Sequence, residues 1–493
     1  MNLTAPIRQH AAERPRAVAL ITPGLRLSYA ELDGAVWRMA GHLAGQGVRR
    51  GDRLGVVVDA CAVGAVVSLA LSRMGAVQYW FAASDTAEIQ QIAVRQFGLG
   101  RLITDSRTDG MAFREIIKVE PRLQDYDQLP AEPFELTDAD ADLPWLGMMS
   151  SGTTGNPKAL FQTHRQTWQR YLTMRSALPM LVYDRIFSLP PMHFSVTLQR
   201  LHWATICGGA IVLPDTYVVP VTVDYINESR ASVLWVTPLH LNALVAVAKQ
   251  RRLSGHLLPH VRDLLCSTAA IDDDLRAAAR KHVAPNLVVA YGASEIGFLS
   301  AVGSFGTGDA PGSIGYPVPG VEVQLVGDSG VIEVAGQVGM IRARSATMTT
   351  SYLNDPETTA RYFKDGWFYP GDLASWNEDG QLIFHGRTDD MMIMDGINIY
   401  PAEIESVLLR HPAIAEAVAF PLKSRQHQNI PVAAIVLREP IDNRELEAFY
   451  RARLGVKAPR YVLVVDAFPR NAAGKVLTGA LAEQLERRRG KGA

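Results

Sequence analysis

The sequence predicts an α/β protein with predominantly parallel sheets, in which a large N-terminal domain is followed by a small one. Three observations support this. Apolar strand-like runs alternate with helical segments over residues 27–290. The 493 residues also exceed what one hydrophobic core usually supports. From Ser329 onward the strand-like runs become short and are separated by Gly and Asp turn signals, which predicts a β-rich lobe.

The first element is an amphipathic helix between Leu27 and Val48. Ser28 and Glu31 have the spacing of a capping box. Residues 54–58 then form an apolar run, and residues 62–74 again have a helical pattern, so strand and helix alternate from the start. The same alternation predicts buried strands at four further runs, namely 186–189, 210–213, 233–236 and 287–290.

The predicted β-rich lobe contains short strands at 331–334, 339–343 and 382–385. After a polar stretch, a helix begins at Pro401 and continues to Arg410, and residues 432–437 form another apolar strand. We therefore expect a large domain of α/β subdomains plus the β-rich lobe over 1–388, and a small mobile α+β domain over 389–493. The charged, glycine-containing tail at 487–493 is expected to fray.

Composition excludes several functional classes. A charged fraction of 20% and a formal net charge of −1 lack the basic excess of a nucleic-acid-binding protein. The three cysteines, Cys61, Cys207 and Cys266, have neither disulfide-framework nor zinc-ligand spacing, which fits a reducing cytoplasm. No apolar run has the length of a membrane span or the pattern of a signal peptide, so we expect neither feature.

The segment Met148 to Lys158, with sequence MMSSGTTGNPK, is rich in groups that bind phosphate. Glycine allows close backbone approach to an anion, the hydroxyl groups can donate hydrogen bonds, and Lys158 supplies positive charge. It is not a Walker A loop, which needs GxxxxGK[ST]. Taken alone, this segment is equally well explained as a flexible polar turn.

Five further motifs follow in a fixed order. They are YGASE from Tyr291, GSIGYPVPG from Gly312, GWFYPGDLA from Gly366, GRTDD from Gly386 and PRNAAGKV from Pro469. With SSGTTGNPK from Ser150, they make the chain resemble, nearly end to end, the AMP-binding, adenylate-forming superfamily. This superfamily contains acyl-CoA synthetases, peptide-synthetase adenylation domains and luciferases.

The resemblance implies that the chain binds ATP with Mg²⁺. Glu295 and Thr154 would ligate the metal, whose charge offsets that of the triphosphate. Tyr291 would stack on adenine beside Gly292, Ser294 and residues 267–270, including Ala269 and Ala270. The phosphate loop would contribute Ser150, Ser151, Gly152, Thr153, Thr154, Gly155 and Lys158.

The resemblance also assigns residues in the last third of the chain. Asp372 would accept both ribose hydroxyls, Arg387 would contact the nucleotide, and Asp389 would be the hinge of the small domain. Lys475 would contact both the acid and the phosphate, lowering the barrier to attack of one anion on another. Its motif departs from the family pattern at Asn471, where Thr is more usual.

His193 lies where acyl- and aryl-CoA synthetases often place a residue that gates the acid pocket, and we interpret it as catalytic or gating; a buried core histidine is the alternative. Phe194 replaces the Asp that pairs the ammonium group in adenylation domains for α-amino acids, which argues against such substrates. The candidate acid pocket comprises His193, Phe194, Ser195, Trp235, Cys266, Ser267 and Ala293. This set forms an apolar site, which is expected to suit an aromatic or medium-chain acid.

The implied function is an ATP-dependent acid–thiol ligase that forms an acyl-AMP with release of pyrophosphate and then an acyl-CoA thioester. Gly396 matches the glycine that lets the pantetheine arm approach, whereas Ile393 replaces a lysine common in relatives. CoA is the first acceptor considered. An acyl carrier protein is the alternative acceptor, and a non-catalytic nucleotide-binding regulator is an alternative from another class. Neither nucleic acid nor a membrane is an expected partner.

Overall fold

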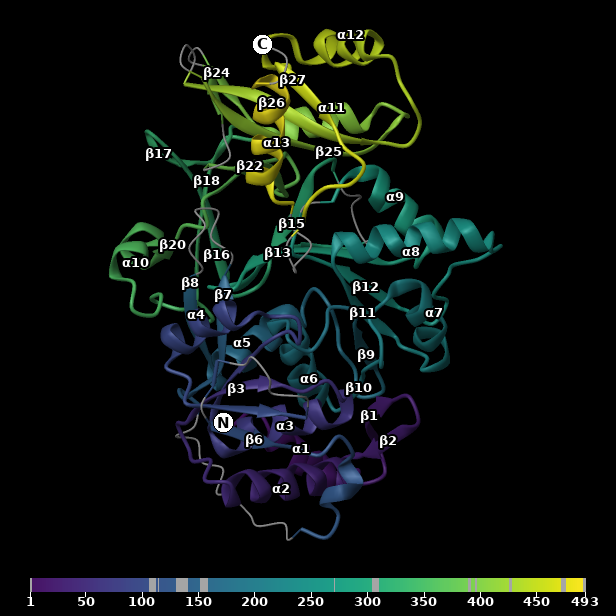
Figure 1. The fold of residues 1–493 in the computed structure, drawn as a ribbon, viewed down its shortest axis with the longest axis vertical. Coiled ribbons are helices and arrows are strands. Elements are labelled where there is room, and N and C mark those ends of the chain that lie inside the picture. The colour runs from purple at the N-terminus through teal and green to yellow at the C-terminus, as the bar shows by residue number, and fades with distance from the viewer. Residues whose placement is uncertain are drawn as a thin grey trace. The chain divides into compact units, whose positions relative to one another are not determined.

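The computed structural model describes residues 2–105, 112–113, 115–129, 141–150, 158–269, 271–303, 310–388, 392–394, 397–424, 428–470 and 476–490. Its ribbon is shown in Figure 1. The chain divides into two compact units. The first contains Met1–Asp309, Ile314–Val323 and Ala343–Phe368, and the second contains Ala310–Ser313, Gln324–Arg342 and Tyr369–Ala493.

The first unit begins with helix α1 and contains a sheet in the order β6-β5-β3-β4-β7-β8. All neighbouring pairs are parallel except β7 with β8, which form a hairpin. The elements of this region are α1 Ala5–Glu13, α2 Tyr29–Gly45, β3 Arg53–Val57, α3 Cys61–Met74, β4 Val77–Trp80, α4 Ala87–Phe97, β5 Arg101–Thr104, β6 Glu115–Lys118, η1 Leu123–Tyr126, β7 Pro144–Ser150, β8 Lys158–Thr163 and α5 His164–Met174.

A second run of strands in this unit has the order β2-β1-β10-β9-β11-β12-β13-β14. Its centre, from β1 to β13, is parallel, whereas β2 and β14 are antiparallel to their neighbours. The elements are β1 Val18–Thr22, β2 Leu25–Ser28, β9 Arg185–Ser188, α6 Ser195–Cys207, β10 Ala210–Val212, α7 Val219–Glu228, β11 Val233–Val236, α8 Pro238–Arg251, β12 Asp263–Cys266, α9 Asp273–His282, β13 Leu287–Ala293 and β14 Gly297–Val302.

The strand order reverses direction at β9. The chain passes from β9 to β10 on one side and then to β11 on the other, so β9 and β11 flank a topological switch point. Ligands of open α/β sheets bind outside the carboxyl ends of strands at such points. The segment 189–194 after β9 and the residues after Val236 are therefore placed where a ligand site is expected.

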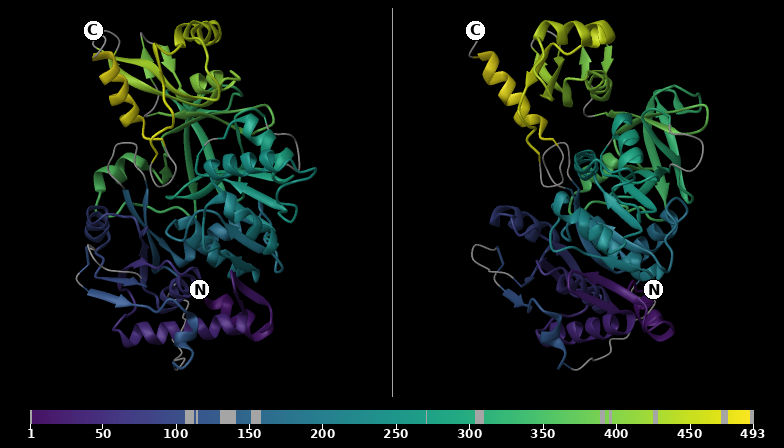
Figure 2. Two further views of the ribbon diagram at one scale, coloured as in Figure 1. Left: turned by 45° about the vertical axis from the view of Figure 1, so that its right-hand side comes forward. Right: turned by 90° about the vertical axis from the view of Figure 1, so that its right-hand side faces the viewer.

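Helices α7, α8 and α9 cover one face of these strands, as Figure 1 and the turned views of Figure 2 show. A buried cluster fills the layer between them, and Leu234, Val236, Leu264 and Cys266 point into it. Because side chains alternate along a strand, Trp235 and Leu265 point to the other face of the sheet.

The predicted elements correspond closely to the observed ones. Helix α2 has the predicted capping box, because the Ser28 side chain accepts from Glu31 N while the Glu31 carboxylate accepts from Ser28 N. The strands at 54–58, 186–189, 210–213, 233–236 and 287–290 are observed as β3, β9, β10, β11 and β13. Strand β13 extends beyond the predicted end through Tyr291 to Ala293.

The second unit contains the predicted β-rich strands and an α+β region. Strand β25 pairs antiparallel with β26, and β26 pairs parallel with β27 around a separate core. Its elements are β17 Gly330–Ile332, β21 Asp372–Trp376, β22 Leu382–Arg387, β23 Met392–Met394, β24 Ile397–Ile399, α11 Pro401–Leu409, β25 Ile414–Ser424, β26 Gln428–Leu437, α12 Asn443–Leu454, η3 Gly455–Lys457, β27 Tyr461–Val464 and α13 Thr478–Gly490.

The remaining elements are β15 Ser313–Pro317, β16 Val321–Gly327, β18 Gly339–Ser345, α10 Pro356–Tyr362, β19 Phe363–Lys364 and β20 Trp367–Phe368. Fraying was expected from Arg487 onward, but helix α13 continues to Gly490. The boundary at Asp389 lies outside the described residues. The predicted domains 1–388 and 389–493 meet at an expected hinge, whereas the two units above are defined by their compactness. The predicted division therefore stays a prediction.

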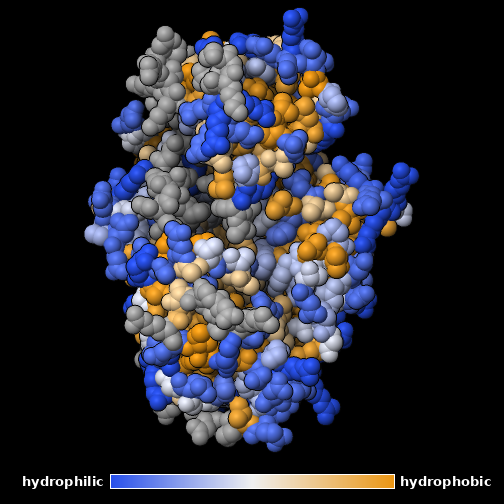
Figure 3. Space-filling model, in the orientation of Figure 1, coloured by the Kyte–Doolittle hydropathy of each residue, from blue (hydrophilic) through white to orange (hydrophobic). Residues whose placement is uncertain are grey.

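The face shown in Figure 3 mixes polar and apolar residues. Among the described residues, no helix combines the length and apolar character needed to cross a bilayer.

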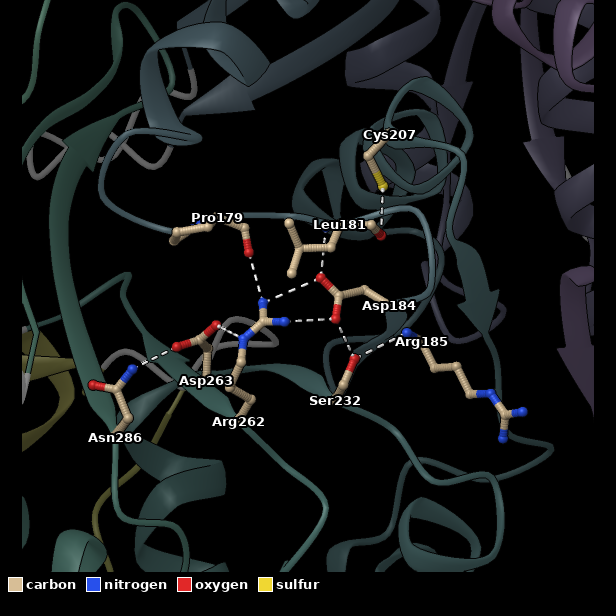
Figure 4. A network of polar contacts seen from close by, with 9 residues as sticks. All are labelled: Pro179, Leu181, Asp184, Arg185, Cys207, Ser232, Arg262, Asp263 and Asn286. Carbon is tan, nitrogen blue, oxygen red and sulfur yellow. Dashed lines mark hydrogen bonds and ion pairs between the residues drawn. The ribbon is translucent and has the colours of Figure 1, made fainter.

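The amino ends of β9, β11, β12 and β13 are joined by a polar network, drawn in Figure 4. The Asp184 carboxylate is buried and accepts hydrogen bonds from Arg262, from the Ser232 hydroxyl and from Leu181 N at 2.7–3.1 Å. Arg262 also pairs with Asp263 at 2.7 Å, and Asn286 donates to Asp263. This network lies at the strand ends opposite to the switch-point site.

Replacing Asp184 with Asn is expected to lower the free energy of unfolding by about 2–3 kcal/mol, because Arg262 loses a charged partner and the amide group presents one acceptor in place of two. Urea unfolding measures this loss. The KM for ATP, measured on the folded variant, is expected to stay unchanged. The exposed pair Arg251–Asp224 provides the control, since Asp224→Asn should cost under about 1 kcal/mol. Equal losses in both variants would contradict a structural role for the network.

Candidate active site

The glycine-rich segment connects β7 to β8, which pair as antiparallel strands. Ser150 is the last residue of β7 and pairs in register with Lys158, the first residue of β8. The Lys158 ammonium lies 3.3 Å from the ring centroid of Tyr362 and 5.4 Å from that of Tyr352. The hairpin therefore positions one predicted phosphate ligand, Lys158, against two tyrosine rings.

Glu295 is buried and contacts one of these tyrosines, Tyr352. The Tyr352 hydroxyl donates to its carboxylate at 2.8 Å, and Thr349 N donates to its backbone carbonyl at 2.7 Å. Tyr352 thus contacts both Lys158 and Glu295, two predicted ligands that are separated by more than a hundred residues in the sequence. The structure brings the two motifs together through a residue that belongs to neither.

Arg170, on α5, supplies positive charge beside Glu295. Its guanidinium is buried and donates to the carbonyls of Ser294 and Thr347 at 3.0 and 3.2 Å. Burial lowers the pKa of Arg170 to about 10, and the charge of Glu295 opposes that shift. Local sequence pattern gave no signal for Arg170 or Tyr352, because both act through contacts between distant segments.

The YGASE motif spans the end of β13 and the turn into β14. Gly292 pairs with Phe298 in this hairpin, and a Cβ atom at Gly292 would lie 2.2 Å from the carbonyl oxygen of Gly297. Ala293 pairs with Gly297 itself. Only glycine fits at position 292 without displacing the opposite strand, so the motif depends on this residue for its shape.

Replacing Gly292 with Ala is expected to lower the free energy of unfolding by about 1–3 kcal/mol, because the added methyl group meets backbone rather than a flexible side chain. We also expect weaker ATP binding, measured by calorimetry. Gly100 is a matched control, since a Cβ there meets nothing within 4 Å and its φ lies outside the left-handed range. If Gly292→Ala behaved like Gly100→Ala, the close approach would have no consequence.

The predicted adenine-side stretch 267–270 follows β12 at the carboxyl edge of the sheet. Ser267 is buried, whereas Thr268 and Ala269 are exposed. Thr268 has φ of 87°, a left-handed backbone conformation that is unfavourable for a β-branched residue. Local strain of this kind is often found at ligand sites.

Of the candidate acid-pocket residues, His193, Phe194 and Ser195 follow β9 at the switch point. Phe194 is the N-cap residue of α6 and its ring lies 4.6 Å from that of His193. Burial lowers the pKa of His193 below its ordinary value. Ser195 begins α6, and Trp235 is buried on β11. Cys266 is not brought together with Trp235, because its side chain points into the helix-covered core on the opposite face.

In the second unit, Asp372 and Arg387 face each other on β21 and β22. Arg387 Nε lies 3.5 Å from Asp372 Oδ1, and its terminal nitrogen donates to the carbonyl of Pro370 at 2.9 Å. The predicted ribose acceptor therefore has a cationic partner.

Several predicted residues lie outside the described part of the chain. The backbone of Ser150 is described, but its side chain is not. The bridge between Arg470 and Val476 and the hydrogen bond from Leu477 N to the Pro469 carbonyl flank the segment that contains Lys475. The undescribed residues are Ser151, Gly152, Thr153, Thr154, Gly155, Ala270, Asp389, Gly396 and Lys475.

Comparison with models of known protein families shows to which family the chain belongs. Residues 7–353 match the model of the AMP-binding enzyme family, and residues 403–475 match that of the AMP-binding enzyme C-terminal domain. This chain belongs to the AMP-binding enzyme family. The family resemblance predicted from the six motifs is thus confirmed, as is the fold of a large N-terminal α/β domain and a small C-terminal domain.

The relatives are acid–CoA ligases. The chain is 28% identical to 2-succinylbenzoate–CoA ligase of Bacillus subtilis strain 168, covering 96% of each protein. It is 27% identical to 3-hydroxybenzoate–CoA ligase of Aromatoleum sp. strain CIB, covering 98% of this chain and 95% of that one. The structure of o-succinylbenzoate CoA synthetase from Bacillus subtilis with its acyl-adenylate intermediate matches with a TM-score of 0.85 at 26% identity, covering 97% of each chain. That synthetase has also been solved with ATP and magnesium ion.

Proposed function

We propose that this protein is an ATP-dependent carboxylic acid–CoA ligase. It converts an acid and ATP to an acyl-AMP and pyrophosphate, and CoA then displaces AMP to form the thioester. The observation that supports this best is the contact of Tyr352 with both Lys158 and Glu295, because it joins the phosphate-loop hairpin to the YGASE motif. The full-length match to acid–CoA ligases supports the same activity.

The residues at Glu295 fit a Mg²⁺ ion bound together with ATP. Magnesium in such sites takes one or two protein ligands and completes its coordination with water and substrate phosphates. Glu295 is a buried carboxylate that shares the neighbour Tyr352 with Lys158 of the phosphate-loop hairpin, so it can supply one such ligand. When bound, the ion would neutralise part of the triphosphate charge. Thr154 is proposed as a further ligand.

We assign each of the chain's own candidate residues a role from the family resemblance. Lys158 and the hydroxyl groups of the loop bind the departing phosphates, while Tyr291 and Gly292 flank adenine. Asp372 and Arg387 bind the ribose and phosphate of the nucleotide. Lys475 stabilises the charge that develops when the carboxylate attacks the α-phosphate. His193 gates the acid, and Asp389 is the hinge of a mobile C-terminal domain.

We further propose that the acid is aromatic or of medium length, since the candidate pocket residues are mainly apolar. It is not an α-amino acid, since Phe194 caps α6 at the position where an ammonium partner would be needed. The acceptor is free CoA, with an acyl carrier protein as the alternative. Lys457, a candidate contact for either acceptor, forms an ion pair with Glu403 at 2.8 Å. A cytoplasmic location and the absence of membrane partners belong to the same proposal.

The test is acid-dependent release of pyrophosphate from ATP over a panel of carboxylic acids, with and without CoA. Stimulation by CoA and detection of acyl-CoA by mass would support the ligase. Release without CoA stimulation would indicate a carrier protein as acceptor. The absence of release with every acid would contradict the proposed activity and favour the regulator.

Replacing Gly396 with Leu is expected to slow thioester formation at least ten-fold while acyl-AMP formation changes little, because by family resemblance a side chain there obstructs the pantetheine arm. Single-turnover assays of each half-reaction measure this. Ile393→Ala, in the same segment, is the control and should affect neither step strongly. Equal loss in both half-reactions would argue against the pantetheine assignment.

A further inference from the structure

Arg200, on helix α6, is a buried cation without an anionic partner. Its side chain is fully buried, and burial shifts its pKa well below the ordinary value. Within the described part of the chain, no carboxylate pairs with Arg200, and neither Nε nor Nη1 has a hydrogen-bond partner. Burying an unpaired charge is costly, so a group that is absent from the protein itself is expected to complete this site.

Arg73 shows how this fold treats a structural buried arginine. Like Arg200, it is fully buried on a helix and stacks on a tryptophan, with its guanidinium carbon 4.5 Å from the Trp37 ring centroid. Unlike Arg200, it forms an ion pair with Asp33 at 2.7 Å. The buried Arg170 also has an Nε atom without a hydrogen-bond partner, but the charge of Glu295 acts on it. The absence of an anion among the described residues therefore distinguishes Arg200 from both of these buried arginines.

Two tryptophan rings stack on the Arg200 guanidinium. Its central carbon lies 3.7 Å from the ring centroid of Trp203 and 3.6 Å from that of Trp235. A tryptophan ring perpendicular to the guanidinium plane would overlap the guanidinium nitrogens at this distance, so each ring lies parallel to that plane. The two rings cannot both lie on the same face of the guanidinium, because they would then overlap each other. The rings therefore cover both faces, while the N–H donors point outward in the plane, which suits bidentate binding of a carboxylate.

The position of Arg200 points to the acid substrate as the source of that carboxylate. Trp235, which stacks on it, is a candidate acid-pocket residue, and α6 begins directly after His193 and Phe194. These elements flank the switch point, and Phe298, whose ring lies 5.4 Å from that of Trp235, pairs with Gly292 of the YGASE motif. An acid activated at one end would place its other end among these aromatic residues.

We propose that Arg200 is a specificity-determining residue that binds a second carboxylate of the substrate, so that the preferred acids are dicarboxylic. This inference rests on the proposed ligase function. One carboxylate of the acid is activated, and Arg200 binds the carboxylate at the opposite end. The aromatic residues Trp203, Trp235 and Phe298 contact the cation and border the remainder of the acid.

The test compares dicarboxylic acids with their monomethyl esters, which keep one carboxylate and nearly the same size but lack the second charge. The panel contains malonate, succinate, glutarate and the three benzenedicarboxylates. We expect kcat/KM for the best diacid to exceed that for its half-ester by about 100-fold, as for loss of a charge-assisted bidentate contact. Arg200→Met is expected to remove this preference, and Arg200→Lys to restore part of it.

Stability separates a binding role from a structural one. Replacing an unpaired buried charge with Met is expected to leave Tm unchanged or raise it, because no ion pair is lost. Arg73→Met, the matched control, is expected to lower Tm and to leave the diacid preference unchanged. A fall in Tm for Arg200→Met together with equal losses for all acids would assign Arg200 a structural role and overturn the proposal, as would equal use of diacids and half-esters by the unsubstituted enzyme.

Calorimetric titration of the panel without ATP distinguishes the two proposals. If diacids bind in a manner that depends on Arg200 but no acid supports pyrophosphate release, the ligase function fails and the Arg200 site stands. If monocarboxylic acids are turned over and no diacid is preferred, the ligase stands and the Arg200 proposal fails. If nothing binds or reacts, both fail.

Discussion

Replacing Lys475 with Ala is expected to lower the rate of acyl-AMP formation by about 10²–10³-fold, the loss typical for removal of one preorganised charge at a reacting group. The carboxylate and the α-phosphate repel each other as they approach, and a cation that contacts both offsets this repulsion mainly in the transition state. We therefore expect kcat to fall much more than KM for ATP rises. Pre-steady-state measurement of acyl-AMP separates these quantities.

A lysine elsewhere in the C-terminal part of the chain serves as control. Lys457 forms its ion pair with Glu403 within the second unit. Lys457→Ala should leave acyl-AMP formation within about two-fold of the unsubstituted rate, because a partly exposed pair contributes little. Near-normal acyl-AMP formation by Lys475→Ala would remove its proposed role.

Replacing Glu295 with Gln is expected to reduce kcat/KM for Mg-ATP by about 10²–10³-fold. The amide can still accept the hydrogen bond from Tyr352, but it no longer supplies a negative charge to the metal or to the buried Arg170. The Mg²⁺ concentration needed for half-maximal rate should rise. Steady-state kinetics over a range of Mg²⁺ concentrations, with Tm recorded in parallel, checks both effects.

The Tyr352→Phe variant distinguishes the effect of the Glu295 charge from the effect of its hydrogen bond with Tyr352. This variant keeps the carboxylate and removes a single hydroxyl, so we expect a loss of about ten-fold or less, equivalent to roughly 1 kcal/mol. An unchanged Mg²⁺ dependence in Glu295→Gln, or losses of the same size in both variants, would argue against metal binding by Glu295.

Much of the fold could be predicted because its signals are local. The capping box at Ser28 and Glu31 defines the start of α2, and apolar runs such as Val233–Val236 coincide with buried parallel strands. The exception at Arg487–Gly490 shows the limit of a local rule, since charge and glycine near the end of the chain predicted fraying where α13 continues. Helix termini depend on packing as well as on composition.

The site could be predicted only in part. The motifs located Lys158 and Glu295 but not the tyrosine that contacts both, because Tyr352 has no distinctive neighbours in the sequence. Cys266 was grouped with Trp235 from motif position, whereas side-chain alternation on β11 and β12 places them on opposite faces of the sheet. Arg200 could be singled out in the sequence only as the one charged residue in the otherwise uncharged run Ser195–Cys207. That it has no anionic partner among the described residues could not be predicted from the sequence.

The sequence by itself determined the family, the alternation of strands and helices, and the residue types available for nucleotide chemistry, because these depend on neighbours along the chain. The tertiary structure alone decided which side chains meet. It placed Tyr352 against Lys158 and Glu295, and it enclosed Arg200 between Trp203 and Trp235 without an anion. Such contacts arise from strand order and from the face to which each side chain points, and both are fixed only when distant segments pack together.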